Sequence, residues 1–183
     1  MESKPILRRI ANRLLATLAQ VLPGATTARP FFHRLRGVHL GADVFIGDGV
    51  YLENEFPECI AIGDHSALAP RVMVIAHVGR TDHKEGPLSG QVIIGQHVFI
   101  GAMSFIGAGP EATVTIGDGA TIGAGVTIVN RSIAPGTLVT APPFMEIATC
   151  EIPLTAARSY NEFVHGIHPI RPKTKGRSGL PHG

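Results

Sequence analysis

The sequence predicts an all-β solenoid in which a short strand recurs every six residues. Written in sixes from Val38, the chain forms 14 hexads outside its interruptions, and 12 of them have Ile, Leu or Val at the third place. Eight have Gly at the fourth place. The composition agrees, because 44% of the chain is hydrophobic although only 5% is aromatic and Trp is absent. Such a chain favours a narrow core filled by aliphatic side chains.

A six-residue period is neither the period of a helix nor the simple alternation of a strand. It fits a short strand whose inward residue recurs once per side, followed by a tight turn at which Gly removes a steric penalty. Three sides make a triangular coil of eighteen residues. Stacked coils then form parallel sheets around a column of Ile, Leu and Val.

The interruptions of the repeat all fall between coils. Grouped in threes, the hexads predict four full coils and one partial coil, at 38–55, 60–77, 92–109, 114–131 and 132–143. The insertions between them are 56–59, 78–91 and 110–113. They therefore leave the triangle at one common corner, and only 78–91 is long. Loops on one edge of a rigid scaffold are where a functional site is expected.

The two ends of the chain do not repeat. Residues 5–22 place apolar side chains at helical spacing with arginines between them, which predicts a helix. This helix either packs on the protein or a neighbouring subunit, or makes a peripheral contact with a membrane surface. A second helix is predicted within 154–166, and the basic residues 171–183 are expected to be disordered. We therefore expect a helical cap, a solenoid and a C-terminal extension, at 1–37, 38–143 and 144–183.

Charge and cysteine content exclude several classes of protein. The net charge of +2 is too small to indicate a nucleic-acid partner. Cys59 and Cys150 are too few for a disulfide framework or a zinc site. No stretch approaches the roughly 18 apolar residues of a membrane span, and the arginine-interrupted N-terminus is unlike a signal peptide. We expect a soluble, cytoplasmic protein.

Hexads such as VFIGDG (44–49) and ATIGAG (120–125) resemble those of the hexapeptide-repeat acyltransferases, and the resemblance covers residues 38–143. It implies a left-handed parallel β-helix, a hand that spacing alone does not predict because parallel crossovers are normally right-handed. The likeness is greatest to sugar and polysaccharide O-acetyltransferases. It further implies acetyl-CoA as the acyl donor and a homotrimer with sites at the subunit boundaries.

His77 is the predicted catalytic residue, because it ends the third hexad of its coil where the long loop departs. Transfer of an acetyl group from a thioester to an alcohol needs a base of near-neutral pKa, and histidine is the usual one. The resemblance implies the same role, since Pro70–His77 is similar to the segment that holds the catalytic histidine in related sugar acetyltransferases. That segment is longer in several of them, which leaves His83 in the loop as the alternative.

An acid beside His77 would orient its imidazole or bind a substrate hydroxyl. Glu53 holds a place where the repeat prefers Gly, and Asp82 and Glu85 lie in the loop. The sequence does not choose among the three acids. Together with His83 they form the expected substrate-binding set.

The donor site is expected along the same corner. Arg131 ends the third hexad of its coil, two coils beyond His77, so strands spaced about 4.8 Å apart place it about 10 Å along the edge. A coenzyme A molecule with its thioester near His77 would bring its anionic groups to Arg131. Asn130–Ser132 also resembles a Thr-Lys/Arg-Ser segment of the family. Small side chains at or after tight turns would let the pantetheine arm approach the backbone, and these are Ala102, Ala108 and Ala124.

These observations predict an acetyl-CoA-dependent O-acetyltransferase acting on a saccharide or other small hydroxyl compound, as in polysaccharide biosynthesis. Transfer would be direct, because no serine or cysteine nucleophile stands beside His77 in the pattern. An N-acyltransferase on an amino sugar and a non-catalytic scaffold or binding protein remain alternatives. No metal is expected, because the zinc-binding members of this fold space two histidines five residues apart, and Ala102 stands five residues after His97.

Overall fold

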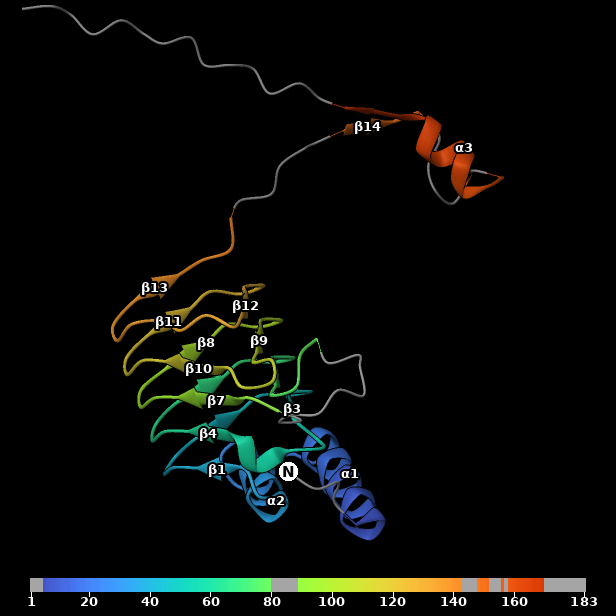
Figure 1. Ribbon diagram of the computed structural model, residues 1–183. Coiled ribbons are helices and arrows are strands. Elements are labelled where there is room, and N and C mark those ends of the chain that lie inside the picture. The colour runs from blue at the N-terminus through green and yellow to red at the C-terminus, as the bar shows by residue number, and fades with distance from the viewer. Residues whose placement is uncertain (1–4, 80–88, 143–147, 152–155, 157, 170–183) are drawn as a thin grey trace, which may run out of the picture. The chain divides into compact units, whose positions relative to one another are not determined.

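The computed structural model describes residues 5–79, 89–142, 148–151, 156 and 158–169. The chain divides into two units, residues 1–141 and 142–183. The first unit holds a solenoid of stacked coils with two helices at its N-terminal end (Figure 1). The division into three parts at 37/38 and 143/144 stays a prediction.

The solenoid has three parallel sheets, as the repeat predicts. One contains β1 (His39–Leu40), β4 (Ile60–Ile62), β7 (Gln91–Ile94) and β10 (Thr113–Ile116) in that order. The second contains β2 (Phe45–Ile46), β5 (Ala67–Leu68), β8 (Phe99–Ile100), β11 (Thr121–Ile122) and β13 (Leu138–Val139). The third contains β3 (Tyr51–Leu52), β6 (Met73–Ile75), β9 (Phe105–Gly107) and β12 (Thr127–Val129).

The strand register confirms the eighteen-residue coil. His39 pairs with Ala61, Ala61 with Ile93, and Ile93 with Thr115. These offsets of 22, 32 and 22 residues are one coil plus insertions of four, fourteen and four residues. The insertions therefore leave the stack at one corner without shifting the ladder.

The core is a column of aliphatic side chains. Both the first and the third residue of a hexad point inward, because side chains alternate along a strand. Val44 and Ile46 of one hexad show this, since both are fully buried while Phe45 between them is exposed. This explains why the first place of every hexad is apolar or small.

The fourth-place glycines serve coil stacking rather than the turn, which corrects the role predicted for them. At the corners after the first and second hexads of a coil, the residue with a left-handed backbone conformation is the sixth of the hexad, not the fourth. His65 at φ 56° and His97 at φ 53° are examples. A Cβ on Gly63 would lie 2.7 Å from the backbone carbon of Gly95 and 2.8 Å from the backbone nitrogen of Gln96. Adjacent coils approach too closely there for any side chain.

The last coil is one residue shorter than predicted. Ile116 bridges to Ile133 and Thr121 pairs with Leu138, an offset of 17 residues. The predicted hexads SIAPGT and LVTAPP were the two without an aliphatic third residue. A shift by one residue places Ile133 and Val139 inward, and both pack against the core.

Two helices precede the solenoid. Helix α1 (Ile6–Val21) agrees with the predicted helix. Helix α2 (Ala28–Arg36) was not predicted, because its nine residues combine Pro30 with four cationic or histidine side chains and lack an apolar stripe. It ends at Gly37, whose φ of 103° favours glycine. The insertion 56–59 forms the short 3-10 helix η1 (Pro57–Cys59).

The second unit contains a small hairpin-like pair, β14 (Ala148–Cys150) and β15 (Ile167–Pro169), which run antiparallel. Between them lies α3 (Tyr160–His165), inside the predicted helical range but shorter. The tail 171–183 lies outside the described residues. Among the described helices, none has the length and apolar content to cross a membrane.

Candidate active site

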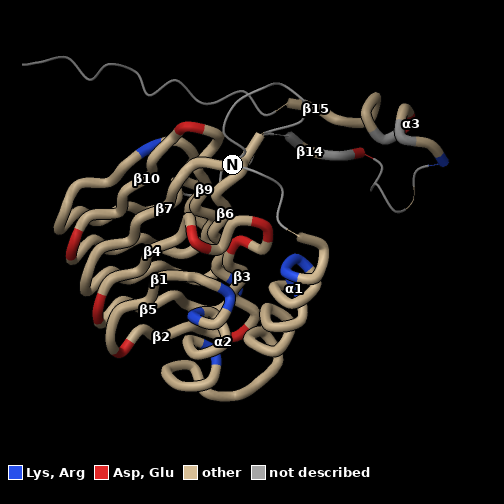
Figure 2. Tube along the Cα trace, turned by 60° about the horizontal axis from the view of Figure 1, so that its bottom comes forward, with Lys and Arg blue, Asp and Glu red and all other residues tan. Residues whose placement is uncertain are grey.

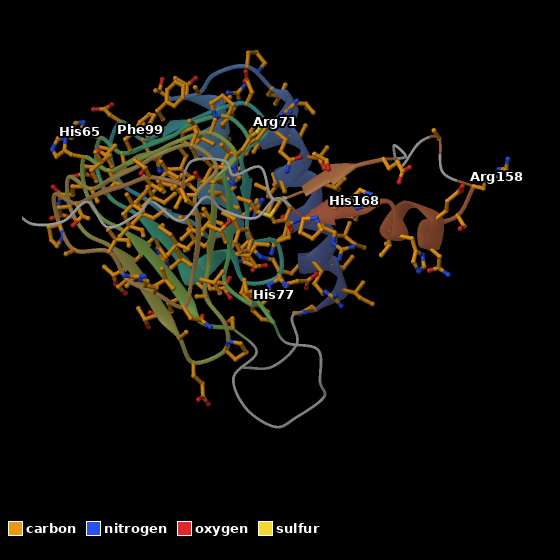
Figure 3. All side chains as sticks on the ribbon, turned by 90° about the horizontal axis from the view of Figure 1, so that it is seen from above. His65, Arg71, His77, Phe99, Arg158 and His168 are labelled. Carbon is orange, nitrogen blue, oxygen red and sulfur yellow. The ribbon has the colours of Figure 1, made fainter. Side chains whose placement is uncertain are left out.

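His77 stands at the corner where all insertions leave the solenoid. The three hexads of its coil end at His65, Arg71 and His77, and these residues lie on different sides in a view along the stack (Figure 3). Leu52 pairs with Val74, so Glu53 follows β3 just below the end of β6. The fold thus brings together Glu53 and His77, which are 24 residues apart in sequence.

Glu53 and His77 are in direct contact. Nδ1 of His77 lies 2.6 Å from Oε2 of Glu53. The Ala76 backbone N–H donates to the same oxygen over 3.0 Å, and the Glu55 N–H donates to Oε1 over 2.8 Å. Glu53 is fully buried, whereas the His77 side chain is 39% exposed. The carboxylate is therefore held on all sides, and the imidazole it contacts faces solvent.

Arg36 of α2 supplies a positive charge beneath this pair. Its guanidinium is buried and donates to the carbonyl of Leu52 over 2.8 Å and to the carbonyl of Glu53. Burial lowers the pKa of Arg36 to about 10, and the nearby Glu53 acts against this fall. Arg36 is therefore still cationic at neutral pH, and its guanidinium fixes the backbone of Leu52 and Glu53 through these two hydrogen bonds.

His33 lies buried one helical turn before Arg36. Burial, with a smaller contribution from Arg36, lowers the pKa of His33 to about 3. This histidine is neutral at physiological pH. It belongs to the packing of the helical cap.

Arg131 occupies the position that the spacing predicts. Ile75 pairs with Gly107, and Gly107 with Val129, so Arg131 is two coils along from His77 at the same corner. Its side chain is exposed. The preceding Asn130 has a φ of 52°, and its Oδ1 accepts the N–H of Gly109 over 2.7 Å, which fixes this corner between the two coils.

The three alanines do not line the His77 corner of one chain. Ala108 is fully buried in the core, its N–H donates to Ile75 and its carbonyl accepts from Val78, so within one chain these backbone groups are already bonded; its contact with a ligand stays a prediction. At this corner the fifth residue of the hexad, here Ala108, has its side chain in the core. Ala102 and Ala124 do stack, since the Gly125 N–H donates to Ala102, but at the corner of Arg71. They would reach a His77 site only from a neighbouring subunit.

The remaining predicted residues have separate outcomes. Asp82, His83 and Glu85 lie outside the described residues. Glu53 cannot bind a substrate hydroxyl, because it is fully buried, so of its two proposed roles only the orienting one fits.

Phe56, in the four-residue insertion, packs edge-on to the His77 ring at a centroid distance of 6.2 Å. Sequence reasoning missed Phe56 and Arg36, although an aromatic residue at the insertion corner was a usable signal for the former.

The described part of the chain contains no group of three side chains suited to hold a metal ion. His65 and His97 stack with ring centroids 5.0 Å apart, and Asp43 lies 3.6 Å from His65. His65 lies at a different corner from His77 (Figure 3). His65 and His97 line up because they hold the same left-handed turn position in successive coils.

The fold and this corner define a class of protein, a left-handed parallel β-helix of hexapeptide repeats with a Glu–His pair at the insertion corner. Residues 91–129 match the family described as the hexapeptide repeat of succinyl-transferase. This match lies inside the repeat region 38–143, for which the sequence resembles the hexapeptide-repeat acyltransferases.

Three known proteins are similar to this chain. The chain is 35% identical over 113 residues to the bifunctional protein GlmU of Acinetobacter baylyi, a match of 58% of this chain and 24% of that protein. The chain thus spans about a quarter of this relative. A maltose O-acetyltransferase structure from Clostridium difficile 630 has a TM-score of 0.55 at 21% identity, over 75% of this chain and 83% of that one. This likeness shows the fold. A hexapeptide-repeat-containing acetyltransferase from Vibrio cholerae has a TM-score of 0.49 at 24% identity, over 75% and 86%.

Proposed function

We propose that this chain is an acetyl-CoA-dependent O-acetyltransferase acting on a sugar or another small hydroxyl compound. The observation that carries the proposal is the 2.6 Å contact between Nδ1 of His77 and the buried carboxylate of Glu53. An exposed imidazole with one nitrogen bound to a fixed acid is the arrangement that general-base catalysis requires. The name of a similar structure, a maltose O-acetyltransferase, supports the same activity.

Glu53 would set the tautomer of His77. When Nδ1–H donates to the Glu53 carboxylate, the lone pair is on Nε2. Nε2 takes the proton from the acceptor hydroxyl as the hydroxyl oxygen attacks the acetyl carbon. A carbon–oxygen bond forms, the carbon–sulfur bond of the thioester breaks, and the imidazolium returns the proton to the leaving thiolate. The Glu53 carboxylate stabilises the imidazolium meanwhile.

Arg131 would bind the anionic groups of the donor. It is an exposed cation in the column of His77, two coils away. Strand spacing places it about 10 Å along the edge, which suits a donor whose thioester lies at His77. Ala102 and Ala124 would border the donor from a second subunit, so the proposal includes the homotrimer.

Calorimetric titration with acetyl-CoA tests the donor without knowledge of the acceptor. We expect saturable binding near one site per chain, weakened at least about tenfold by Arg131→Ala because a charge-assisted contact is lost. Arg34→Ala, which removes an exposed arginine of α2 away from both corners that would border the donor, is the matched control. Absence of binding up to millimolar acetyl-CoA would reject the enzyme and favour a scaffold protein.

Release of free thiol in the presence of acceptors tests the chemistry. Maltose is the first acceptor to try, because it is named for a similar structure, followed by other saccharides and by amino sugars. His77→Ala should lower kcat by about 10²–10⁴-fold, while His65→Ala should not. A full rate in His77→Ala would mean that another group is the base.

A further inference from the structure

Helix α1 turns its apolar side away from the protein. The residues it buries are Asn12, Ala16 and Ala19, and it packs against α2 and β3 through this side. Six large apolar residues are instead 39–79% exposed. We name them the α1 stripe: Ile6, Leu7, Ile10, Leu14, Leu18 and Val21. At 100° per residue they occupy one sector about 120° wide, opposite the buried residues.

The α1 stripe has a basic border. Helix α1 contains three arginines and no acidic residue, so its charges are all positive (Figure 2). Arg9 and Arg13 lie beside the stripe and, with Ile6 and Ile10, line a shallow hollow of about 280 Å³. Both side chains pair with Glu55 and are nevertheless exposed at the surface.

We propose that the α1 stripe docks on an anionic membrane surface, with the helix lying in the plane of the bilayer. A contiguous exposed apolar patch marks an interaction site. An apolar face bordered by arginines, without acidic residues, matches the chemistry of an anionic lipid surface. Sixteen residues extend only about 24 Å, and the arginines exclude burial of the whole helix, so α1 lies on the membrane rather than across it.

The charge pattern favours lipid over a second copy of this helix. Arg9 and Arg13 share a single carboxylate, that of Glu55, so one positive charge is left over at the edge of the stripe. A second α1 contains no acidic residue to balance it and would bring three more arginines. A layer of anionic headgroups provides such partners along the whole length of the helix.

The docked helix would lie close to the His77 corner. Arg9 Nε contacts Glu55 Oε2 at 2.9 Å, the Glu55 N–H donates to Glu53 at 2.8 Å, and Glu53 contacts His77 at 2.6 Å. Docking would therefore hold this corner near the headgroups. The proposal itself rests on the helix alone and stands whether or not the chain transfers acetyl groups.

Vesicle sedimentation of the full chain tests the docking. The probes are phosphatidylcholine vesicles and vesicles of an equimolar mixture of phosphatidylcholine and phosphatidylglycerol. We expect binding to the mixed vesicles that weakens at high salt, because the arginine contribution is screened. The double variant Leu7→Gln, Leu14→Gln should bind at least about tenfold more weakly, because two exposed leucines no longer enter the lipid.

Two further variants make the result specific. Arg9→Gln, Arg13→Gln should lower the preference for anionic over neutral vesicles. Leu138→Gln replaces an equally exposed leucine on the solenoid and should bind like the unmodified chain. The proposal is overturned if the unmodified chain does not sediment with mixed vesicles, or if the leucine double variant sediments equally well. It is also overturned if that variant instead lowers the particle mass in light scattering, because a second copy would then cover the stripe.

Discussion

Glu53 occupies a position of the repeat that normally serves coil packing, and it contacts a candidate catalytic residue instead. At the fourth place of most hexads, the adjacent coil leaves no room for a side chain, as at Gly63. In the third sheet this place accepts larger residues, including Ile75 and Val129. Glu53 uses the same freedom to reach the end of the next strand. The neighbouring N–H groups and Arg36 compensate its charge, as a buried carboxylate requires.

Replacing Glu53 by Gln should separate orientation from packing. The amide fills the same space but cannot stabilise an imidazolium, so we expect kcat to fall about 10–100-fold with little change in KM for acetyl-CoA. Steady-state thiol release at varied acetyl-CoA concentration measures both kinetic constants.

The matched control is Glu55→Gln, two residues away. Its side chain bonds Arg9 and Arg13 rather than His77. An unchanged kcat in Glu53→Gln would remove Glu53 from the mechanism.

His33 should make the folded state sensitive to acid. Its pKa is about 3 in the folded chain and about 6.5 when unfolded. Between these values the unfolded chain binds the extra proton, so the free energy of unfolding is undiminished above pH 6.5 and falls as the pH drops towards 3. From pH 7 to 4.5 this contribution is on the order of 2 kcal/mol.

Urea midpoints at pH 7 and 4.5 measure this loss. His33→Gln should show a smaller drop between the two pH values than the unmodified chain. His39→Gln, which replaces an exposed histidine, should keep the full drop. Equal drops in all three proteins would mean that His33 does not titrate as its burial requires.

At the scale of elements, the stacking of coils imposes the strictest demands. Gly63→Ala would push a Cβ into the backbone of Gly95 and Gln96, which cannot yield as a flexible side chain would. We expect a loss of about 3 kcal/mol in the free energy of unfolding. Gly119→Ala, at φ 66° with open space around it, should cost only about 1–2 kcal/mol, from the left-handed backbone.

Urea denaturation of both variants gives the comparison. If Gly119→Ala proved the more costly of the two, the turn conformation rather than coil contact would be the limiting demand. The same stacking explains the shortened last coil. The strand register there is set by the burial of Ile133 and Val139 against the core, and this requires one residue fewer than three complete hexads.

At the scale of the whole molecule, the proposed site is incomplete in one chain. His77 and Arg131 share one corner, while Ala102 and Ala124 stack at the corner of Arg71. A cyclic assembly would place one subunit's corner against another's. We therefore expect three times the chain mass of 19.3 kDa in light scattering after size exclusion. A monomer at micromolar concentration would contradict a shared site.

The amino-acid sequence by itself determined the coil, the common corner of the insertions, and the position of His77 and Arg131 along it. All three follow from the six-residue repeat, because this pattern is local in the sequence and can be counted without knowledge of tertiary contacts. Only the tertiary structure decided which acid contacts His77, because Glu53 reaches it from another coil. The same holds for Arg36, which lies in a helix that the sequence pattern does not predict. Periodicity likewise showed that α1 has an apolar face but not where that face points. Its small side chains pack closely on the protein, so the large ones remain outside.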